Sequence, residues 1–256
     1  MKEITIPQYE LVYNSLSFAI AAMGAATLFL WISRSMVSPA YRTAITISGL
    51  VTAIALYHYL RIFGSWTSTF NVSNDTIALT GVKFNDAYRY VDWLLTVPLL
   101  LIELILVMRL SRQETISKSI RLGSLAALMI LLGYPGEISA DSNMRWIFWV
   151  LAMIPFTIIV LELFNGLKTA IANQPASVRG LVNAARFFTV GSWCFYPIVF
   201  ILPMIGFTSG AAIAAVQVGY TIADIVAKAV FGLLIYAIAV RKSELETTPS
   251  SSSVTA

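Results

Sequence analysis

The chain of 256 residues has one cysteine, one histidine and few charges, and each scarcity excludes a class of protein. Cys194 alone cannot build a disulfide framework, and together with His58 it is too little for a His/Cys zinc site. Charged residues make up 12% of the chain and hydrophobic residues 58%, and the mean hydropathy is +0.78. This composition excludes a soluble globular domain and predicts an integral membrane protein.

Seven apolar runs are long enough for membrane spans, since a helix needs about 20 apolar residues to cross the hydrocarbon core. The predicted spans are 11–33, 44–66, 86–108, 120–136, 146–165, 182–206 and 212–240. The fourth is the shortest and ends at Pro135. Because no run alternates like a membrane β-strand, we predict an all-α membrane protein, a seven-transmembrane-helix bundle. The first run is already of span length, so we expect no cleavable signal peptide.

Lysine and arginine residues gather on one side of this predicted bundle. Three lie within spans (Arg61, Arg89, Lys228), three lie on the N-terminal side (Lys2, Lys83, Arg145), and eleven share the other side: Arg34, Arg42, Arg109, Arg112, Lys118, Arg121, Lys168, Arg179, Arg186, Arg241 and Lys242. The positive-inside rule therefore predicts the N-terminus outside and the C-terminus in the cytoplasm. The net charge of +4 follows from this bias and needs no nucleic-acid partner.

Two segments outside the spans have their own character. The connection 64–86 is the longest and is polar, and its portion 76–81 is expected to form a short hairpin. Residues 243–256 are rich in serine and threonine, which predicts a disordered cytoplasmic tail. Residues 1–242 would then form a single membrane domain.

Lys228 is the one lysine inside a predicted span, and Asp224 precedes it by one helical turn. An ionised lysine at mid-membrane depth costs about 2.5–3.5 kcal/mol, so it needs a partner or a covalent purpose. Asp224 shares its helix face and can be that partner. A desolvated amine also condenses with an aldehyde to give a Schiff base. The pair is therefore either a structural ion pair or a site of covalent chemistry.

Two acids, Asp92 and Glu103, share one face of the third span. They are eleven residues apart, which at about 100° and ~1.5 Å per residue gives nearly the same direction and a separation of roughly 16 Å. Thr96 lies between them with a hydroxyl to donate to either acid. Arg89 favours the charged form of Asp92, whereas burial without a nearby cation keeps Glu103 neutral at rest. This division suits a proton relay; the alternative for Glu103 is a buried acid bonded to a neighbouring backbone.

The sequence resembles the microbial (type 1) rhodopsins. Residues 89–100, Arg-Tyr-Val-Asp-Trp-Leu-Leu-Thr-Val-Pro-Leu-Leu, with Glu103 following, resemble the third helix of that family. Residues 224–228, Asp-Ile-Val-Ala-Lys, resemble its retinal-binding seventh helix, and residues 193–197, Trp-Cys-Phe-Tyr-Pro, match its pattern beside the polyene. Matches in register on separate helices are more specific than a lone motif. The resemblance covers essentially the whole chain and is greatest to the proteorhodopsin and xanthorhodopsin branch.

This resemblance implies roles for the intramembrane residues. Lys228 would hold retinal, all-trans at rest, as a protonated Schiff base with Asp92 and Asp224 as counter-ions. Asp92 would be the primary proton acceptor, and Glu103 the donor that reprotonates Lys228. The triplet Asp92, Thr96 and Glu103 is similar to that of proteorhodopsins and xanthorhodopsins. Chloride pumps lack the first carboxylate, and sodium pumps carry Asn, Asp and Gln, so both kinds are disfavoured.

Further residues match the family's retinal pocket. His58 resembles the histidine that bonds the primary acceptor; the alternative is a core histidine bonded to a backbone carbonyl. Aromatic side chains fit a slot for a flat polyene, although on periodicity alone they are more often simple packing. The residues that the resemblance assigns to the pocket are Trp93, Leu100, Met129, Gly133, Trp149, Trp193, Tyr196 and Pro197.

Two departures from the family narrow the subtype. At Trp149, antenna-binding xanthorhodopsins have a glycine that opens a groove to the ring end of retinal. The indole would fill that groove, so we expect no carotenoid antenna. The stretch 206–220 contains no acid, so the paired glutamates that release protons early in bacteriorhodopsin have no counterpart there. The timing of proton release is therefore left open.

The resemblance implies a light-driven outward proton pump, a transporter rather than an enzyme, in the plasma membrane of a prokaryote. Its partners would be lipid, protons and further copies of itself in a trimer or pentamer. The alternative is a photosensor that signals to a membrane partner, but a sensor needs no efficient donor at Glu103. A transporter or receptor that uses Lys228 only in a salt bridge is a third interpretation. Leu100 stands where proteorhodopsins have leucine or glutamine, which predicts green rather than blue absorption.

Overall fold

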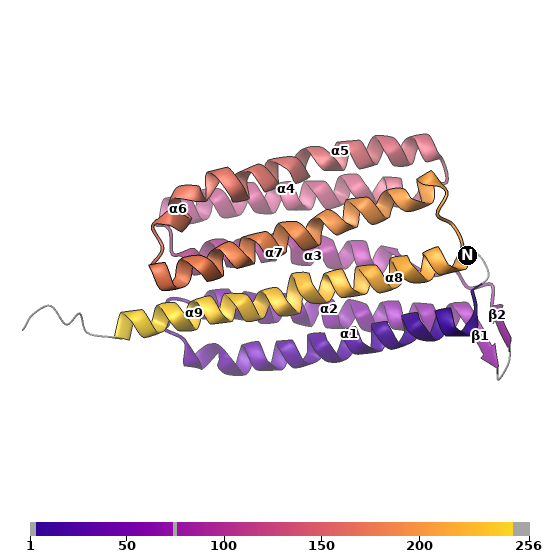
Figure 1. Cartoon of the computed structure of the whole chain (residues 1–256), viewed down its shortest axis with the longest axis horizontal. Helices are drawn as coiled ribbons and strands as arrows, with labels where there is room; N and C mark the ends of the chain where they lie inside the picture. Colours follow the sequence, from indigo (N-terminus) through magenta and orange to yellow (C-terminus); the bar gives the residue numbers. More distant parts are fainter. Residues whose placement is uncertain (1–3, 74–75, 248–256) are drawn as a thin grey trace, which may run out of the picture.

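The computed structural model describes residues 4–73 and 76–247 (Figure 1). Within them, seven helical segments that are long and apolar enough to cross a membrane run side by side. They span Ile6–Met36, Arg42–Thr69, Ala87–Met108, Arg112–Ile138, Ser142–Gly166, Ala176–Ile205 and Gly210–Thr247. Each contains most or all of one predicted span, so the predicted seven-helix bundle is confirmed.

Several of these segments are built from more than one element. The α-helices are α1 (Ile6–Ser33), α2 (Arg42–Thr69), α3 (Ala87–Met108), α4 (Arg112–Ile138), α5 (Ser142–Leu161), α6 (Lys168–Ala172), α7 (Ala176–Ile201), α8 (Gly210–Asp224) and α9 (Phe231–Thr247). Two short 3₁₀ turns, η1 (Arg34–Met36) and η3 (Leu202–Ile205), extend α1 and α7. Two π-helical segments are η2 (Glu162–Gly166), after α5, and η4 (Ile225–Val230), which joins α8 to α9.

Helix α4 begins earlier than its hydropathy predicts, at Arg112 instead of residue 120. The cause is a capping box, in which the Ser111 hydroxyl accepts from the Glu114 N–H and the Glu114 carboxylate accepts from the Ser111 N–H, both at 3.3 Å. The helix also continues through Pro135 to Ile138, past its predicted end. Hydropathy thus located the apolar centre of this helix, while its cap decides where it starts.

The helices pack mainly in sequence order, and α1 also contacts α8, which closes the bundle. Helix α3 is the most enclosed of the seven segments: 61% of its most apolar stretch is buried, compared with 22% for α4. Large apolar side chains such as Phe18, Ile32 and Ile154 are exposed on the outside. This apolar exterior suits lipid, and the enclosed α3 is where intramembrane charges can be satisfied.

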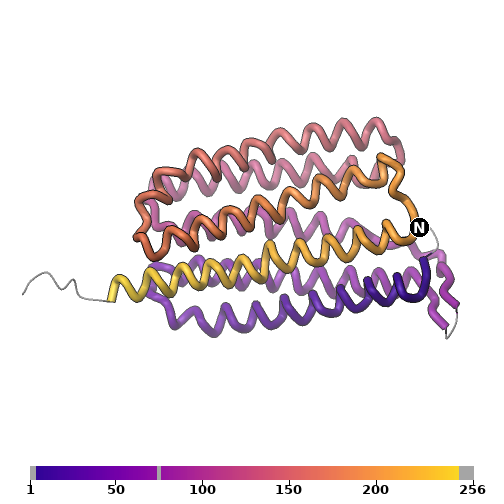
Figure 2. Tube along the Cα trace, viewed as in Figure 1, coloured from indigo at the N-terminus to yellow at the C-terminus, as the bar shows by residue number. Residues whose placement is uncertain are grey.

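The two ends of the bundle differ, as Figure 2 shows. One end carries the described N-terminus and the antiparallel strands β1 (Phe70–Ser73) and β2 (Thr76–Leu79), with Phe70 opposite Leu79. We call it the hairpin end, and the opposite end, where α9 finishes, the tail end. A hairpin was predicted within residues 76–81, but these residues supply only the second strand, because the segment before them forms the first.

The last helix continues beyond the predicted domain boundary at residue 242. Ser243 Oγ accepts a hydrogen bond from the Ser38 N–H at 2.8 Å, and Glu246 accepts one from the Tyr41 hydroxyl at 2.5 Å. These contacts tie the final turns of α9 to the segment before α2. Residues 243–247 are therefore helical, contrary to the prediction, and the remainder of the predicted tail, 248–256, lies outside the described residues.

Candidate functional site

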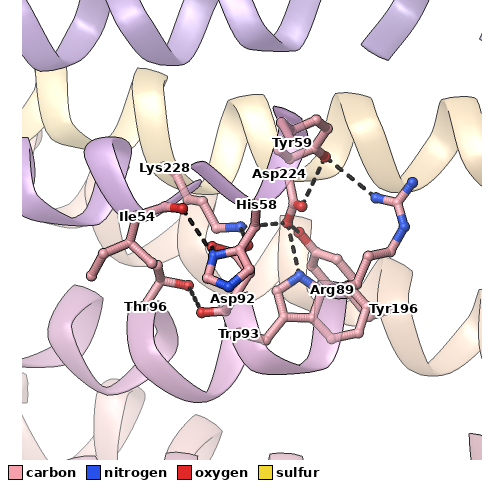
Figure 3. A network of polar contacts seen from close by, with 10 residues as sticks. All are labelled: Ile54, His58, Tyr59, Arg89, Asp92, Trp93, Thr96, Tyr196, Asp224 and Lys228. Carbon is pink, nitrogen blue, oxygen red and sulfur yellow. Dashed lines mark hydrogen bonds and ion pairs between the residues drawn. The ribbon is translucent and has the colours of Figure 1, made fainter. Parts of the chain in front are cut away.

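Lys228 lies in the π-helical segment η4 with its side chain 1% exposed, between two carboxylates (Figure 3). Its ammonium donates a hydrogen bond to Asp92 Oδ2 from α3 and lies 3.1 Å from Asp224 Oδ1 at the end of α8. Both aspartates are also 1% exposed. A buried cation is tolerated only when it is paired, and here it has two partners. The predicted grouping of these three residues is thus present in the structure.

The two carboxylates are held very differently. Asp224 accepts hydrogen bonds from Tyr59 of α2 at 2.8 Å, Trp93 of α3 at 3.1 Å and Tyr196 of α7 at 2.6 Å. Asp92 Oδ1 is buried and accepts no hydrogen bond from any residue that the structure describes. Hydrogen bonds to a carboxylate stabilise its charged form. Asp224 is therefore a fixed anion, whereas Asp92 keeps an oxygen free for a proton.

Two residues expected beside Asp92 are bonded instead to their own helices. His58 Nδ1 lies 2.9 Å from the Ile54 carbonyl oxygen and 3.8 Å from Asp92 Oδ1, which is beyond hydrogen-bond range. The Thr96 hydroxyl donates to the backbone carbonyl of Asp92 at 2.8 Å, not to either acid's carboxyl group as expected. In both cases the carbonyl four residues earlier is the nearest acceptor in a helix. The backbone-bonded alternative for His58 is thus the arrangement observed, with Asp92 as its close neighbour.

Arg89 also departs from the expectation, because no hydrogen bond or ion pair in the described residues joins it to Asp92. Side chains on a helix point toward its N-terminus, and this direction carries the guanidinium away from Asp92. Its Nη2 donates to Gln217 Oε1 at 2.7 Å and its Nη1 to the Tyr59 hydroxyl at 3.4 Å. Through Tyr59 the arginine is connected to Asp224.

Glu103 is fully buried about 16 Å along α3 from Asp92 by helix geometry, toward the tail end. It accepts one hydrogen bond, from the Ser48 hydroxyl of α2 at 2.5 Å, and no ion pair joins it to a cation in the described part of the chain. Behind Ser48, hydroxyls continue inside the bundle, because Thr52 Oγ1 donates to the Ser48 carbonyl and accepts from Thr27 Oγ1. The expected alternative, a bond to a neighbouring backbone, is therefore wrong; the partner is a side-chain hydroxyl.

A cavity among α3, α4, α5, α7 and η4 reaches Lys228 and Asp224. Its lining is almost entirely apolar and aromatic, with Trp93 and Tyr196 edge to face at 5.0 Å between centroids. All eight residues assigned to the pocket from the sequence line it: Trp93, Leu100, Met129, Gly133, Trp149, Trp193, Tyr196 and Pro197. An apolar cavity with an amine at one end fits a long apolar molecule that carries an aldehyde.

Three polar residues of this site were not found from the sequence. Tyr59 follows His58 and bonds Asp224, Gln217 bonds Arg89, and Ser48 bonds Glu103. Gln217 could have been identified from the sequence, since it is a lone amide in an apolar helix two turns before Asp224. Ser48 had none, because small hydroxyl residues are common in spans and usually bond to their own backbone.

Comparisons with known proteins identify the family of this chain. The model of the family described as bacteriorhodopsin-like protein matches residues 11–242. The green-light absorbing proteorhodopsin of Gamma-proteobacterium EBAC31A08 is 31% identical over 236 residues, which are 90% of this chain and 88% of the relative. The crystallographic structure of xanthorhodopsin, a light-driven ion pump with dual chromophore, is 47% identical with a TM-score of 0.92, over 95% of this chain and 97% of that one.

The crystal structure of thermophilic rhodopsin is 42% identical with a TM-score of 0.94, and the match covers 97% of this chain and all of the other. The similarity therefore extends over the whole bundle, in sequence as well as in fold. The chain belongs to the bacteriorhodopsin-like family and is a microbial rhodopsin of the proteorhodopsin and xanthorhodopsin branch.

Proposed function

We propose that this rhodopsin is a light-driven ion pump that carries protons from the cytoplasm to the outside. Its proteorhodopsin and xanthorhodopsin relatives support the pump, and xanthorhodopsin is itself a light-driven ion pump. The observation that carries the proton assignment is the contrast around Lys228. Asp92 contacts the amine and has an oxygen without a hydrogen bond, while Asp224 is saturated by three donors.

Members of this family bind retinal, and the residues of the apolar cavity fit it. Lys228 Nζ is the group that would bond to its aldehyde as a protonated Schiff base, and the aromatic lining would hold its polyene. When bound, retinal supplies light absorption and isomerisation. The protein supplies the attachment, the exclusion of water and the groups that hold protons before and after each transfer.

Asp92 is the acceptor of the proton held on Lys228 Nζ. The two groups are in direct contact, so the transfer needs no intermediate carrier. Asp224 stays ionised because three hydrogen bonds stabilise its charge. A proton that reaches Asp92 therefore neutralises one anion and leaves the other beside Lys228.

Glu103 is the donor that restores the proton on Lys228 Nζ. It lies eleven residues after Asp92 on α3, nearer the tail end, and its carboxyl is fully buried. With no cation beside it among the described residues, it holds its own proton at rest. The hydroxyl of Ser48 keeps it oriented along the interface of α2 and α3.

The direction of transport follows from the distribution of basic residues. Arg34, Arg109, Arg112 and Arg241 lie toward the tail end, and by the positive-inside rule they support a cytoplasmic tail end. Asp92 accepts on the hairpin side and Glu103 supplies from the tail side, so the net movement is outward. We place the protein in the plasma membrane of a prokaryote, as a trimer or pentamer.

We further propose that retinal is the only chromophore, although xanthorhodopsin has two. The Trp149 indole lines the cavity and donates a hydrogen bond to the Pro197 carbonyl at 3.0 Å. This bond fixes the ring between α5 and α7, across the place where a second pigment would approach retinal. Extraction of the purified pigment should yield retinal without carotenoid.

The proposed function is tested by illuminating an unbuffered suspension of retinal-fed cells that express the protein. We expect the medium to become acidic in light and a protonophore to abolish the change, while cells expressing Lys228→Ala show none. Alkalinisation that a protonophore enhances would indicate a pump for another ion. Pigmented cells without any light response of pH or membrane voltage would favour the photosensor.

A further inference from the structure

A second polar region lies at the hairpin end, outside the site around Lys228. It is a cavity of about 300 Å³ between the start of α3, the end of α4, the start of α5 and the helices α7 and α8. Its polar lining includes Asp86, Glu137, Arg145, Gln217 and Tyr220. The volume is enough for several water molecules, each of which occupies about 30 Å³ in the liquid. The cavity is therefore able to carry a proton as well as to hold polar side chains.

Gln217 connects this cavity to the inner site. Its Oε1 accepts from Arg89 Nη2 at 2.7 Å, and its amide donates to the Asp86 carboxylate. Arg89 in turn donates to Tyr59, whose hydroxyl bonds Asp224. A continuous line of hydrogen bonds thus runs from the counter-ion of Lys228 to an acid at the surface end of the bundle.

A second acid, Glu137, faces Asp86 from the last turn of α4, and the two carboxyl charges repel each other. Arg145 of α5 lies between the elements, with Nη2 3.6 Å from Glu137 Oε2 and Nη1 donating to the Glu137 carbonyl at 3.0 Å. The phenols of Tyr90 and Tyr220 also face this pair but are neutral.

Asp86 precedes α3 and lies outside the spans. Burial raises the pKa of the Asp86 carboxyl, and the charges of Arg89 and Arg145 and the bond from Gln217 oppose this effect. Because the two acids line one cavity and repel each other, they titrate as a coupled pair, and burial favours a proton kept between them. The geometry therefore provides a proton store on the outer side of Arg89.

We propose that Asp86 and Glu137 form the proton-exit group of the pump, which discharges its proton to the outside when Asp92 receives one from Lys228. This proposal rests on the proposed function. When Asp92 is neutralised, the electrostatic attraction of the inner carboxylates for Arg89 becomes weaker. The charge of Arg89 then acts more strongly on Asp86 through Gln217. The proton passes from the carboxyl oxygen to water, and the pair is left with one more negative charge until the cycle returns a proton to it.

The first test uses purified, retinal-loaded protein with a pH-sensitive dye and a light flash. In the parent we expect the dye to report a released proton about when Lys228 Nζ loses its own. In Glu137→Gln and Asp86→Asn, release should be delayed to the end of the cycle while pigment colour is kept. Glu10→Gln is the matched control, because Glu10 is an exposed acid on α1 near the hairpin end. Parent-like timing in both variants would overturn the exit assignment.

The second test needs no light and separates this proposal from the proposed function. Infrared titration of the unilluminated protein should show a protonated carboxyl band at neutral pH, in addition to that of Glu103, that either substitution removes, because one proton is shared. If neither substitution removes any protonated carboxyl intensity relative to the parent, the pair stores no proton. If the parent moves no protons in light, the proposed function fails, and this titration still decides whether the pair holds a proton.

Discussion

The two halves of helix α3 each contribute an intramembrane acid, but their surroundings have little in common. On the hairpin side, Asp92 lies within a dense set of charges and hydrogen bonds that includes Lys228, Asp224 and Arg89. On the tail side, Glu103 has one hydrogen-bond partner, and the residues around it on α3, Leu101, Leu104 and Val107, are buried and apolar. The hairpin side of α3 is thus rich in polar contacts, whereas the tail side is mainly apolar.

This difference shows how a pump avoids becoming a channel. On the hairpin side, hydrogen bonds run from Asp224 through Tyr59 and Arg89 to Gln217, so in the proposed cycle a proton can move outward there without large movements. In the proposed cycle, a proton entering toward Glu103 must wait until apolar packing opens, because buried side chains exclude water there. The hairpin side and the tail side are therefore not accessible to protons at the same time in the proposed cycle. Substitutions on either side should change this difference.

The largest effect should come from removing the centre that both sides serve. Lys228→Ala eliminates the amine, so we expect a colourless protein with no light-driven transport. Absorption spectra of the purified protein and pH recordings of retinal-fed cells check this. A full visible band with covalently bound retinal would contradict the attachment site.

The next largest effect should come from neutralising the polar side. Asp92→Asn removes the anion that contacts Lys228, so the pigment should absorb further to the red and outward pumping should stop. Acid should produce a similar red shift in the parent, as Asp92 takes up a proton. Spectra across pH, with pumping assays on the same preparations, are the measurement, and an unchanged spectrum with normal transport would refute the role of Asp92.

The tail side of α3 is tested with Glu103→Gln. Asp92 should still accept the first proton. The state with deprotonated Lys228 Nζ should then decay at least about 10²-fold more slowly, since a positioned proton donor accelerates proton transfer by at least this factor. The decay should slow further as pH rises, because bulk protons become the source, and azide should restore it. Flash spectroscopy measures these rates, and Glu244→Gln, an exposed acid at the tail end, is the control. A pH-independent decay at the parent rate would exclude Glu103 as donor.

A smaller effect is expected from His58→Ala. The ring lies 3.8 Å from Asp92 and is bonded to the Ile54 carbonyl, so it acts on the carboxylate through space. Its removal should move the midpoint of the acid-induced red shift without stopping the pump. If the midpoint is the same in both proteins, His58 serves only in packing.

The smallest change should follow Leu100→Gln in the pocket. An amide dipole near the Schiff-base end would stabilise the charge in the ground state, so absorption should move toward the blue while transport continues. The parent itself should absorb in the green. An absorption spectrum decides this, and a parent pigment that already absorbs blue would contradict the role of Leu100.

The sequence was sufficient wherever one helix alone determines the geometry. The apolar runs located all seven spans, the eleven-residue spacing placed Asp92 and Glu103 on one face, and the four-residue spacing placed Asp224 beside Lys228. These relations depend only on helical rise and rotation. The pocket residues were located through the family resemblance and line the same cavity.

Relations between helices were beyond the sequence. Which carboxylate is saturated depends on three donors from three helices, and spacing along α3 cannot indicate that Tyr59 and Tyr196 reach Asp224. Arg89 was assigned to Asp92 from proximity in sequence, but its side-chain direction takes it to Gln217. The Asp86 and Glu137 pair was also missed, because its members come from different elements and no spacing along the chain indicates that they meet.

The π-helical segment η4 also fixes the rotational phase of the last helix. The buried side chains of α9 include Ile235, Ile238 and Lys242, a set at helical spacing, and the Lys242 amine donates to the carbonyls of Val107 and Met108 at the end of α3. Deleting one residue from η4 would turn this whole face by about 100°. Ile235 and Ile238 would then point away from the bundle, and Lys242 would lose its carbonyl partners. The length between Asp224 and Phe231 is therefore fixed by the packing of α9.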